Sequence, residues 1–386
     1  MSSFKVLTVR GIPIRIHITF PLVLVLAAVQ FALIQSNRIQ GAIFGVVVTL
    51  LLFVGVVLHE LAHSLVAIQF GSRVEEIVLL PLGGVARMED VPERPYQELF
   101  MAIAGPVTSG LIGLALGVSI FLLFPQGWTE ILSRFTQAFF LRTRPLEWVH
   151  ILPYLAFVNI FLAIFNMIPA FPMDGGRVLR AILASVMPFG RATAVAVGVG
   201  KGLAWIIGLF GLATGNILVI LVALFVYMGA VQEGRMVKVK VALAGLKVRQ
   251  VFSRQARAVS PFVPLGQAVD MMLEGFQADF PVCDGERLVG MLTRDDVLSA
   301  LKERGPQVAI EDVMQRDFVV ARPEEDLFDV QQRMTQANVD VVPVVETDCF
   351  LGLLTRQDLD EAYRVVSVLP GILRDEQPGS ILSGGR

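Results

Sequence analysis

The sequence predicts a polytopic α-helical membrane domain followed by a soluble α/β domain. Hydrophobic residues make up 54% of the 386 residues and charged residues only 17%, far from the composition of a soluble protein. Long uncharged runs fill residues 18–232, whereas the chain after Lys238 has ordinary globular composition. An internal repeat in this second part predicts a duplicated α/β unit.

Charge and cysteine content exclude two classes of protein. The net charge is −2, and no basic stripe is present, so the sequence gives no sign of nucleic-acid binding. Cys283 and Cys349 are the only cysteines, and both fall in the soluble part. Two cysteines are too few for a disulfide framework and are consistent with a reducing compartment, so we expect this part to be cytoplasmic.

Apolar runs long enough to cross a bilayer core of about 30 Å predict about six transmembrane helices. They cover residues 18–34, 41–57, 99–124, 148–168, 178–212 and 217–231. The second run continues into His59 and beyond. The first run resembles a signal peptide, but it lacks a clear small-residue cleavage site and is long enough to span. The fifth contains Pro188 and Gly190 and is either one broken span or a short helix followed by a span.

An even number of spans places both termini on the same side of the membrane. The positive-inside rule makes that side the cytoplasm, because basic residues flank the spans there. These residues are Lys5, Arg10, Arg15, Arg73, Arg87, Arg94, Arg235, Lys238 and Lys240. Arg134, Arg142 and Arg144 favour the opposite orientation.

The sequence His59-Glu60-Leu61-Ala62-His63 predicts a metal site. Residues four apart lie on one face of a helix, so both imidazoles can reach a single ion. Glu60 can then act as general base toward a metal-activated water. The alternative is a polar helix end or a hydrogen-bonded histidine pair, but ionisable groups following the apolar run 41–58 are costly unless they are used.

A hydrolytic zinc site needs a third protein ligand, and Asp174 is the best candidate. It follows the fourth span in the sequence 166–177, NMIPAFPMDGGR. The second and fourth spans run in the same direction, so Asp174 and the two histidines come to the same side of the membrane. The alternative is that Asp174 only caps the helix after Gly175 and Gly176.

The two motifs together resemble those of the site-2 protease family of intramembrane zinc metalloproteases, in the branch that carries CBS domains. The residues 11–17, 82–89 and 104–106 (GIPIRIH, LGGVARME and AGP) also fit that family, so the resemblance covers nearly the whole chain. It implies one Zn²⁺ per chain bound by His59, His63 and Asp174, with Glu60 activating the water. Asn166 would hydrogen-bond the substrate backbone or the oxyanion.

The resemblance also favours a function for residues 77–88. This stretch is rich in β-branched and apolar residues, interrupted by Pro81 and glycines, and predicts a short membrane-associated hairpin with an exposed edge. An extended substrate can add to that edge at Gly83, Gly84 and Val85. A plain connecting loop is the alternative. The implied substrate is a single-span membrane protein.

The soluble part contains two copies of one pattern, displaced by 62 residues. Strands are expected at 280–282, 288–292, 342–345 and 350–354, so each copy resembles a CBS domain. In that family the Thr and Asp of Gly-x-x-Thr-x-x-Asp contact the ribose of an adenosyl ligand such as ATP or AMP. These residues here are Thr293, Asp296, Thr355 and Asp358. The alternative is that both pairs only cap helices.

The predicted domains are 1–240 (membrane), 247–305 and 309–366 (CBS repeats) and 367–386, a tail without assigned structure. CBS pairs often dimerise, so we expect a homodimer or higher oligomer. Two other functions are considered. A CBS-regulated transporter or channel leaves the histidine motif unexplained, and an inactive homologue has no need of Glu60.

Overall fold

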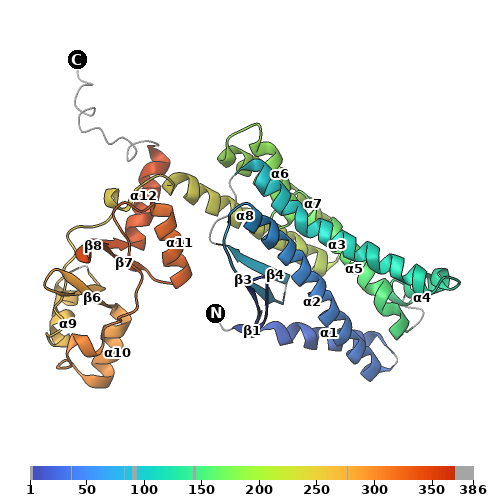
Figure 1. The fold of residues 1–386 in the computed structure, drawn as a ribbon, viewed down its shortest axis with the longest axis horizontal. Helices are drawn as coiled ribbons and strands as arrows, with labels where there is room; N and C mark the ends of the chain where they lie inside the picture. The colour runs from blue at the N-terminus through green and yellow to red at the C-terminus, as the bar shows by residue number, and fades with distance from the viewer. Residues whose placement is uncertain are drawn as a thin grey trace, which may run out of the picture. The chain divides into compact units, whose positions relative to one another are not determined.

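The computed structural model describes residues 3–35, 37–81, 83–88, 94–141, 145–275 and 277–369, and it divides into two compact units (Figure 1). The division falls between Arg235 and Met236, inside one long helix, α8 (Ile217–Leu243). The predicted tail starts two residues too early, because the last helix, α12 (Arg356–Val368), includes residues 367 and 368, and residues 370–386 lie outside the described residues. The first unit is mostly helical, and the second has a mixed α/β fold.

Five helices of the described residues are long and apolar enough to cross a membrane. They are α2 (Arg38–Gln69), α3 (Pro95–Leu123), α5 (Ile151–Asn166) with the 3-10 turn Trp148–His150 before it, α7 (Phe189–Thr214) and α8. The first predicted span forms α1 (Phe20–Ile34), which has only 15 residues. At about 1.5 Å per residue α1 is about 22 Å long, shorter than a bilayer core of about 30 Å. Long helices thus account for five of the six predicted spans.

The fifth predicted span is a short helix followed by a span. Pro188 separates α6 (Asp174–Ala184) from α7 and is the N-cap residue of α7. A proline inside a helix removes a backbone donor, which explains why the apolar run breaks here. The short helix matters because it begins with Asp174.

Large apolar side chains cover the outside of the long helices. Leu122, Trp205 and Leu218 are 68%, 65% and 67% exposed. An apolar surface of this extent would be unstable in water and suits lipid. The chain is therefore a multi-pass membrane protein.

An amphipathic helix, α4 (Trp128–Phe139), lies between the third and fourth predicted spans, where no element was predicted. Its Phe135 and Ala138 are buried against Phe31 and Phe44 of α1 and α2. Only one face of α4 is apolar, so this segment contains no continuous apolar run from which a helix could be predicted.

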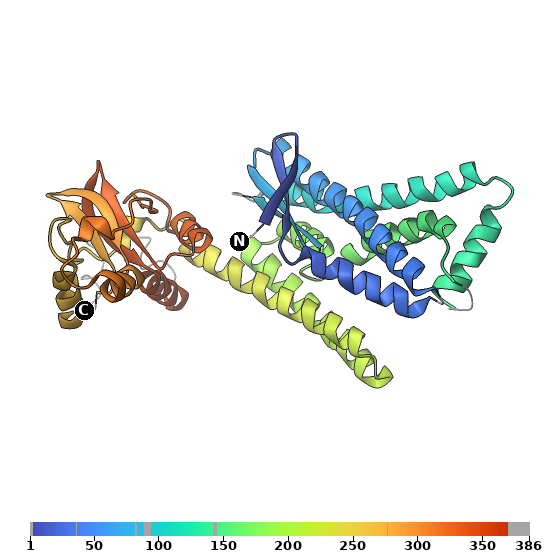
Figure 2. The ribbon, with the colours of Figure 1, turned by 90° about the horizontal axis from the view of Figure 1, so that it is seen from below.

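A four-stranded sheet accompanies the helices, in the order β1-β2-β3-β4 (Figures 1 and 2). Its strands are β1 (Ser3–Val9), β2 (Ile12–His17), β3 (Val74–Leu80) and β4 (Gly83–Met88). The central pair is parallel, with Ile14 opposite Ile77, because α1 and α2 form the crossover between them. Ile14 and Ile77 pack against Val57 and Leu61 of α2, so the sheet lies directly beside the histidine motif.

The second unit contains the two predicted repeats in one sheet of order β5-β6-β8-β7. Its elements are α9 (Leu265–Glu274), β5 (Phe280–Asp284), β6 (Arg287–Leu292), α10 (Arg294–Arg304), α11 (Leu327–Ala337), β7 (Val341–Glu346), β8 (Cys349–Thr355) and α12 (Arg356–Val368), with short 3-10 turns at Val248–Gln250 and Ile310–Asp312. Parallel bridges join Val259 to Val282 and Ala321 to Val344 at equivalent positions of the repeats. Both cysteines are free.

Candidate metal centre

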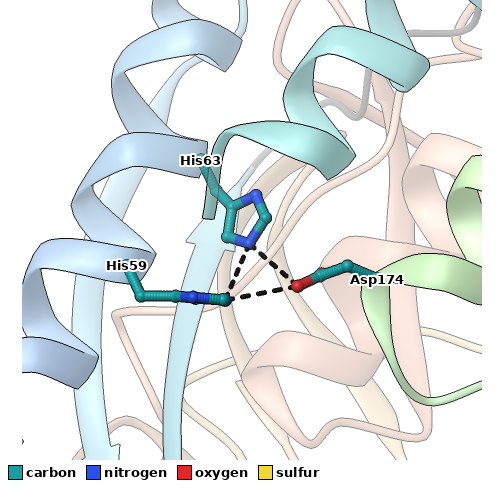
Figure 3. Close-up of side chains that lie close together, drawn as sticks. All are labelled: His59, His63 and Asp174. Carbon is teal, nitrogen blue, oxygen red and sulfur yellow. Dashed lines mark hydrogen bonds and ion pairs between the residues drawn. The ribbon is translucent and has the colours of Figure 1, made fainter. Parts of the chain in front are cut away.

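Three side chains meet at one point inside the membrane unit, as the sequence predicts for His59, His63 and Asp174 (Figure 3). The two histidine Nε2 atoms lie 3.1 Å apart. Asp174 Oδ2 lies 3.2 Å from His59 Nε2 and 3.3 Å from His63 Nε2. The histidines are one turn apart on α2, and Asp174 comes from the start of α6.

The donor set fits a zinc ion. Zinc in hydrolytic sites is held by three protein ligands, often two imidazoles and one carboxylate, with an open fourth position. Ligand atoms about 2.0 Å from a tetrahedral zinc ion lie about 3.3 Å from one another. The three separations of 3.1, 3.2 and 3.3 Å match this edge length closely.

Hydrogen bonds from α3 orient both imidazoles. His63 Nδ1 lies 2.6 Å from the carbonyl oxygen of Met101, which can only accept, so the proton of His63 is on Nδ1. The lone pair of Nε2 then faces the cluster. His59 Nδ1 lies 2.9 Å from Ser109 Oγ, which holds that ring in the same way. Such outer partners fix the tautomer and angle of metal-binding histidines.

Gly105 lets α3 approach the two histidines. A Cβ atom at this position would lie 2.6 Å from His59 Nε2 and would also overlap His63 Nε2. Only glycine therefore leaves room for the imidazoles and an ion. Gly105 belongs to the family feature Ala104-Gly105-Pro106, but its role could not be predicted. Ser109 was missed entirely, since a serine in an apolar helix carries no distinctive signal.

The segment between α5 and α6 presents Asp174. Ala170, Phe171 and Met173 are at most 4% exposed and pack against α7 and α8. Met173 is the N-cap residue of α6 and makes no side-chain capping bond, and Asp174 is the first helical residue. The carboxylate of Asp174 points to the two histidines. The alternative, that Asp174 only caps the helix, is therefore wrong.

A buried ion-pair cluster fixes α6 further along. Arg180 Nε donates to Glu98 Oε1 of α3 at 2.8 Å, and Arg180 also pairs with Glu233 of α8. The rings of Phe171 and Phe189 lie 5.1 and 5.0 Å from the Arg180 guanidinium carbon. Three helices are thus joined about two turns after Asp174. No sequence motif marked these residues, because their pairing depends on helices far apart in the chain.

Glu60 faces strand β4. A Cβ atom at Gly84 would lie 2.5 Å from Glu60 Cγ, so β4 passes in direct contact with the predicted base. Gly84 pairs with Leu79 of β3, and β4 has no partner strand on its other side in the described sheet. Gly83 has φ of 143°, and Val85 is 48% exposed. The predicted hairpin therefore exists, and its edge strand contacts Glu60.

Asn166 is the last residue of α5 and is half-buried. Within the described residues its side chain makes no hydrogen bond, and it is not part of the three-ligand cluster. Its predicted role toward substrate stays a prediction. The remaining histidines, His17 and His150, lie outside the cluster as well.

The four predicted nucleotide-binding residues form two matching capping boxes. Thr293 Oγ1 donates to Asp296 Oδ2 at 2.6 Å, and Thr355 Oγ1 donates to Asp358 Oδ2 at 2.7 Å. Each pair caps the helix that follows it, α10 or α12. The capping interpretation is therefore realised in both repeats, and nucleotide binding stays a prediction.

The fold and the cluster define a membrane-embedded metal centre of the type that zinc hydrolases use. The model of "Peptidase family M50" matches residues 47–209, and the CBS domain model matches residues 248–303 and 310–365. A zinc metalloprotease of Methanocaldococcus jannaschii is 36% identical over 366 residues, which cover 95% of this chain and 97% of that protein. Stage IV sporulation protein FB of Bacillus subtilis is 29% identical over 138 residues, 36% of this chain and 40% of that protein.

The solved structure of a site-2 protease from Methanocaldococcus jannaschii is 41% identical, covers 60% of this chain and 95% of that chain, and has a TM-score of 0.43. The near full-length match to the zinc metalloprotease shows the family. This chain belongs to the site-2 protease family, peptidase family M50, and carries tandem CBS domains.

Proposed function

We propose that this protein is an intramembrane zinc endopeptidase that cleaves membrane-spanning proteins in regulated intramembrane proteolysis. The observation that carries the proposal is the meeting of His59, His63 and Asp174, with separations that suit one zinc ion per chain. Glu60 stands next to the first ligand, as a general base requires. The family resemblance implies a single-span membrane protein as the substrate class.

Zinc held by the three ligands would polarise the scissile carbonyl and lower the pKa of a water. Glu60 takes a proton from the attacking water and delivers it to the departing amine. Ser109 and the Met101 carbonyl hold the two imidazoles so that their Nε2 atoms face the point where the ion would be bound. Asn166 is assigned to the substrate backbone or the oxyanion, where a side-chain amide can donate.

The edge of β4 is the proposed binding site for unwound substrate. A helix hides its carbonyls in internal hydrogen bonds, so the bond to be cut must first be extended. An extended segment can add to the free edge at Gly83, Gly84 and Val85. The contact between Gly84 and Glu60 supports this assignment, since a segment on that strand lies close to the base.

The CBS pair is the proposed regulatory part, binding an adenine nucleotide of the ATP or AMP type through Thr293, Asp296, Thr355 and Asp358. Helix α8 supports a coupling. Its Val226 and Ala230 belong to the apolar clusters that hold the segment before Asp174, and its last residue, Leu243, belongs to the core of the second repeat. We further propose a homodimer or higher oligomer in the cell membrane, with both termini and the CBS domains in the cytoplasm.

The test is cleavage of a tagged single-span protein in proteoliposomes by the wild type and by Glu60→Gln, with zinc measured in both. Loss of proton transfer lowers the rate by about 10²–10⁴-fold while zinc is retained. Glu130→Gln is the matched control, because Glu130 lies on the exposed face of α4 in an ion pair with Arg134. A wild type without zinc, or equal rates for wild type and Glu60→Gln, overturns the proposal and favours the transporter or channel hypothesis.

A further inference from the structure

Lys201 places a cation in the middle of a spanning helix. It lies 12 residues from Phe189 and 13 from Thr214, the ends of α7. At about 1.5 Å per residue, each end is about 18 to 20 Å away along the helix axis. A lysine near a helix end reaches the headgroups, but one at this depth needs a partner within the membrane.

Among the described residues, the Lys201 ammonium contacts the ring of Tyr227 on α8, at 5.8 Å from the centroid, and forms no ion pair. The carboxylates of the described spanning helices are committed elsewhere. Glu60 stands beside the metal cluster, and Glu98 and Glu233 pair with Arg180. The described helices of a second copy therefore offer no free carboxylate at this depth, and lipid phosphates lie at the membrane surface.

Lys201 follows a residue that packs on the segment leading to the metal centre. The preceding residue, Gly200, packs on the segment that leads to Asp174: a Cβ atom there would lie 3.5 Å from Ala170 Cα and 3.4 Å from Ala230 Cβ. A Cβ atom at Gly198 or Gly202 would meet no atom within 4 Å. The helix surface next to Lys201 is thus open to another helix.

We propose that Lys201 binds a carboxylate in the transmembrane segment of the substrate and so sets the register in which that segment reaches the metal centre. The inference rests on the proposed protease function and names a feature of its substrates, an Asp or Glu near mid-membrane. Before a substrate binds, the Tyr227 ring stabilises the Lys201 ammonium, since a ring face attracts a cation. An ion pair at this depth is poorly screened and selects one register over its neighbours.

The test compares two single-span substrates that differ only by Glu or Gln at the mid-membrane position. Polar contacts between membrane helices contribute about 0.6 to 1.7 kcal/mol, so the wild type should cleave the Glu substrate about 3- to 20-fold faster. In Lys201→Met this rate ratio should fall to about one, and in Lys201→Arg it should persist. Zinc content of each variant, measured alongside, reports whether the metal centre is intact.

Cleavage sites mapped by mass spectrometry give a second readout. Moving the Glu by one helical turn should move the cut in the wild type and not in Lys201→Met. Equal rates for the Glu and Gln substrates with the wild type overturn the inference but leave the protease proposal standing. If the wild type cuts neither substrate, nor a panel of unrelated single-span proteins, the protease function fails and this inference fails with it.

Discussion

The membrane unit and the CBS unit use polar side chains in opposite ways. In the membrane unit several buried polar groups form clusters that occur once, as three ligands at the metal centre, two outer partners and one ion-pair cluster around Arg180. In the CBS unit the same arrangement occurs twice, because Thr293 with Asp296 and Thr355 with Asp358 cap equivalent helices. Duplicated capping has a structural role, whereas the ionisable cluster of His59, His63 and Asp174, which occurs once in an apolar surrounding, indicates chemistry.

The largest expected contrast concerns ion pairs. Arg180→Met leaves Glu98, which is 1% exposed, without its partner, and should lower the free energy of unfolding by about 3–5 kcal/mol. The control is Arg356→Met in the CBS unit. Arg356 pairs with Asp340, and the two side chains are 55% and 76% exposed, so the expected loss is about 0–1 kcal/mol. Denaturant unfolding in detergent measures both. Equal losses of unfolding free energy in the two variants would show that burial does not make the Arg180 pair more important for stability than the Arg356 pair.

Ser109→Ala tests the outer partners of the metal centre. Without the hydroxyl, the His59 ring loses its orienting bond, and zinc affinity should fall by about 10–100-fold. Competition with a chelator measures the affinity. Ser119→Ala is the matched control on the same helix, because Ser119 Oγ only bonds the Ala115 carbonyl on an exposed face. An unchanged affinity in Ser109→Ala would contradict the orienting role.

Gly84→Ala tests the contact between β4 and the base. The new methyl group would lie 2.5 Å from Glu60 Cγ and must displace that side chain or the strand. Because a small misplacement of a catalytic group is expensive, cleavage should slow by about 10–100-fold with zinc retained. Gly117→Ala on α3, where a Cβ atom meets nothing within 4 Å, should behave as wild type. If both variants keep full rate, β4 does not position Glu60.

The smallest effects are expected for the loss of a helix cap in the CBS unit. Thr293→Ala and Thr355→Ala each remove one helix cap and should each cost about 0.5–2 kcal/mol of stability. The two losses should be similar, because the backbone N–H groups of Asp296 and Asp358 donate to the threonine Oγ1 atoms at 3.3 and 3.1 Å in the two repeats. Thermal unfolding with and without AMP or ATP checks this. A nucleotide-dependent stabilisation lost in only one variant would show that one repeat binds ligand in addition to capping.

The two units also differed in how much could be predicted. In the CBS unit both repeats and their strands were correctly predicted, because each repeat is a local pattern of apolar strands and capped helices. In the membrane unit the long helices were predicted from apolar length, but α1 proved too short to span by length, and α4 was missed. A search for continuous apolar runs does not test whether a run such as α1, only 15 residues long, can cross the membrane, and it overlooks α4, whose apolar residues recur on one face of the helix.

The sequence by itself determined what is local: the helix-forming apolar runs, the duplicated pattern and the spacing that puts His59 and His63 one turn apart with Glu60 between them. Only the tertiary structure decided which distant groups meet. Asp174 was predicted as the third ligand from its motif and the topology of the spans, but Gly105 and Ser109 come from another helix, and β4 reaches Glu60 through a parallel crossover. These contacts depend on packing between elements, so no local periodicity records them.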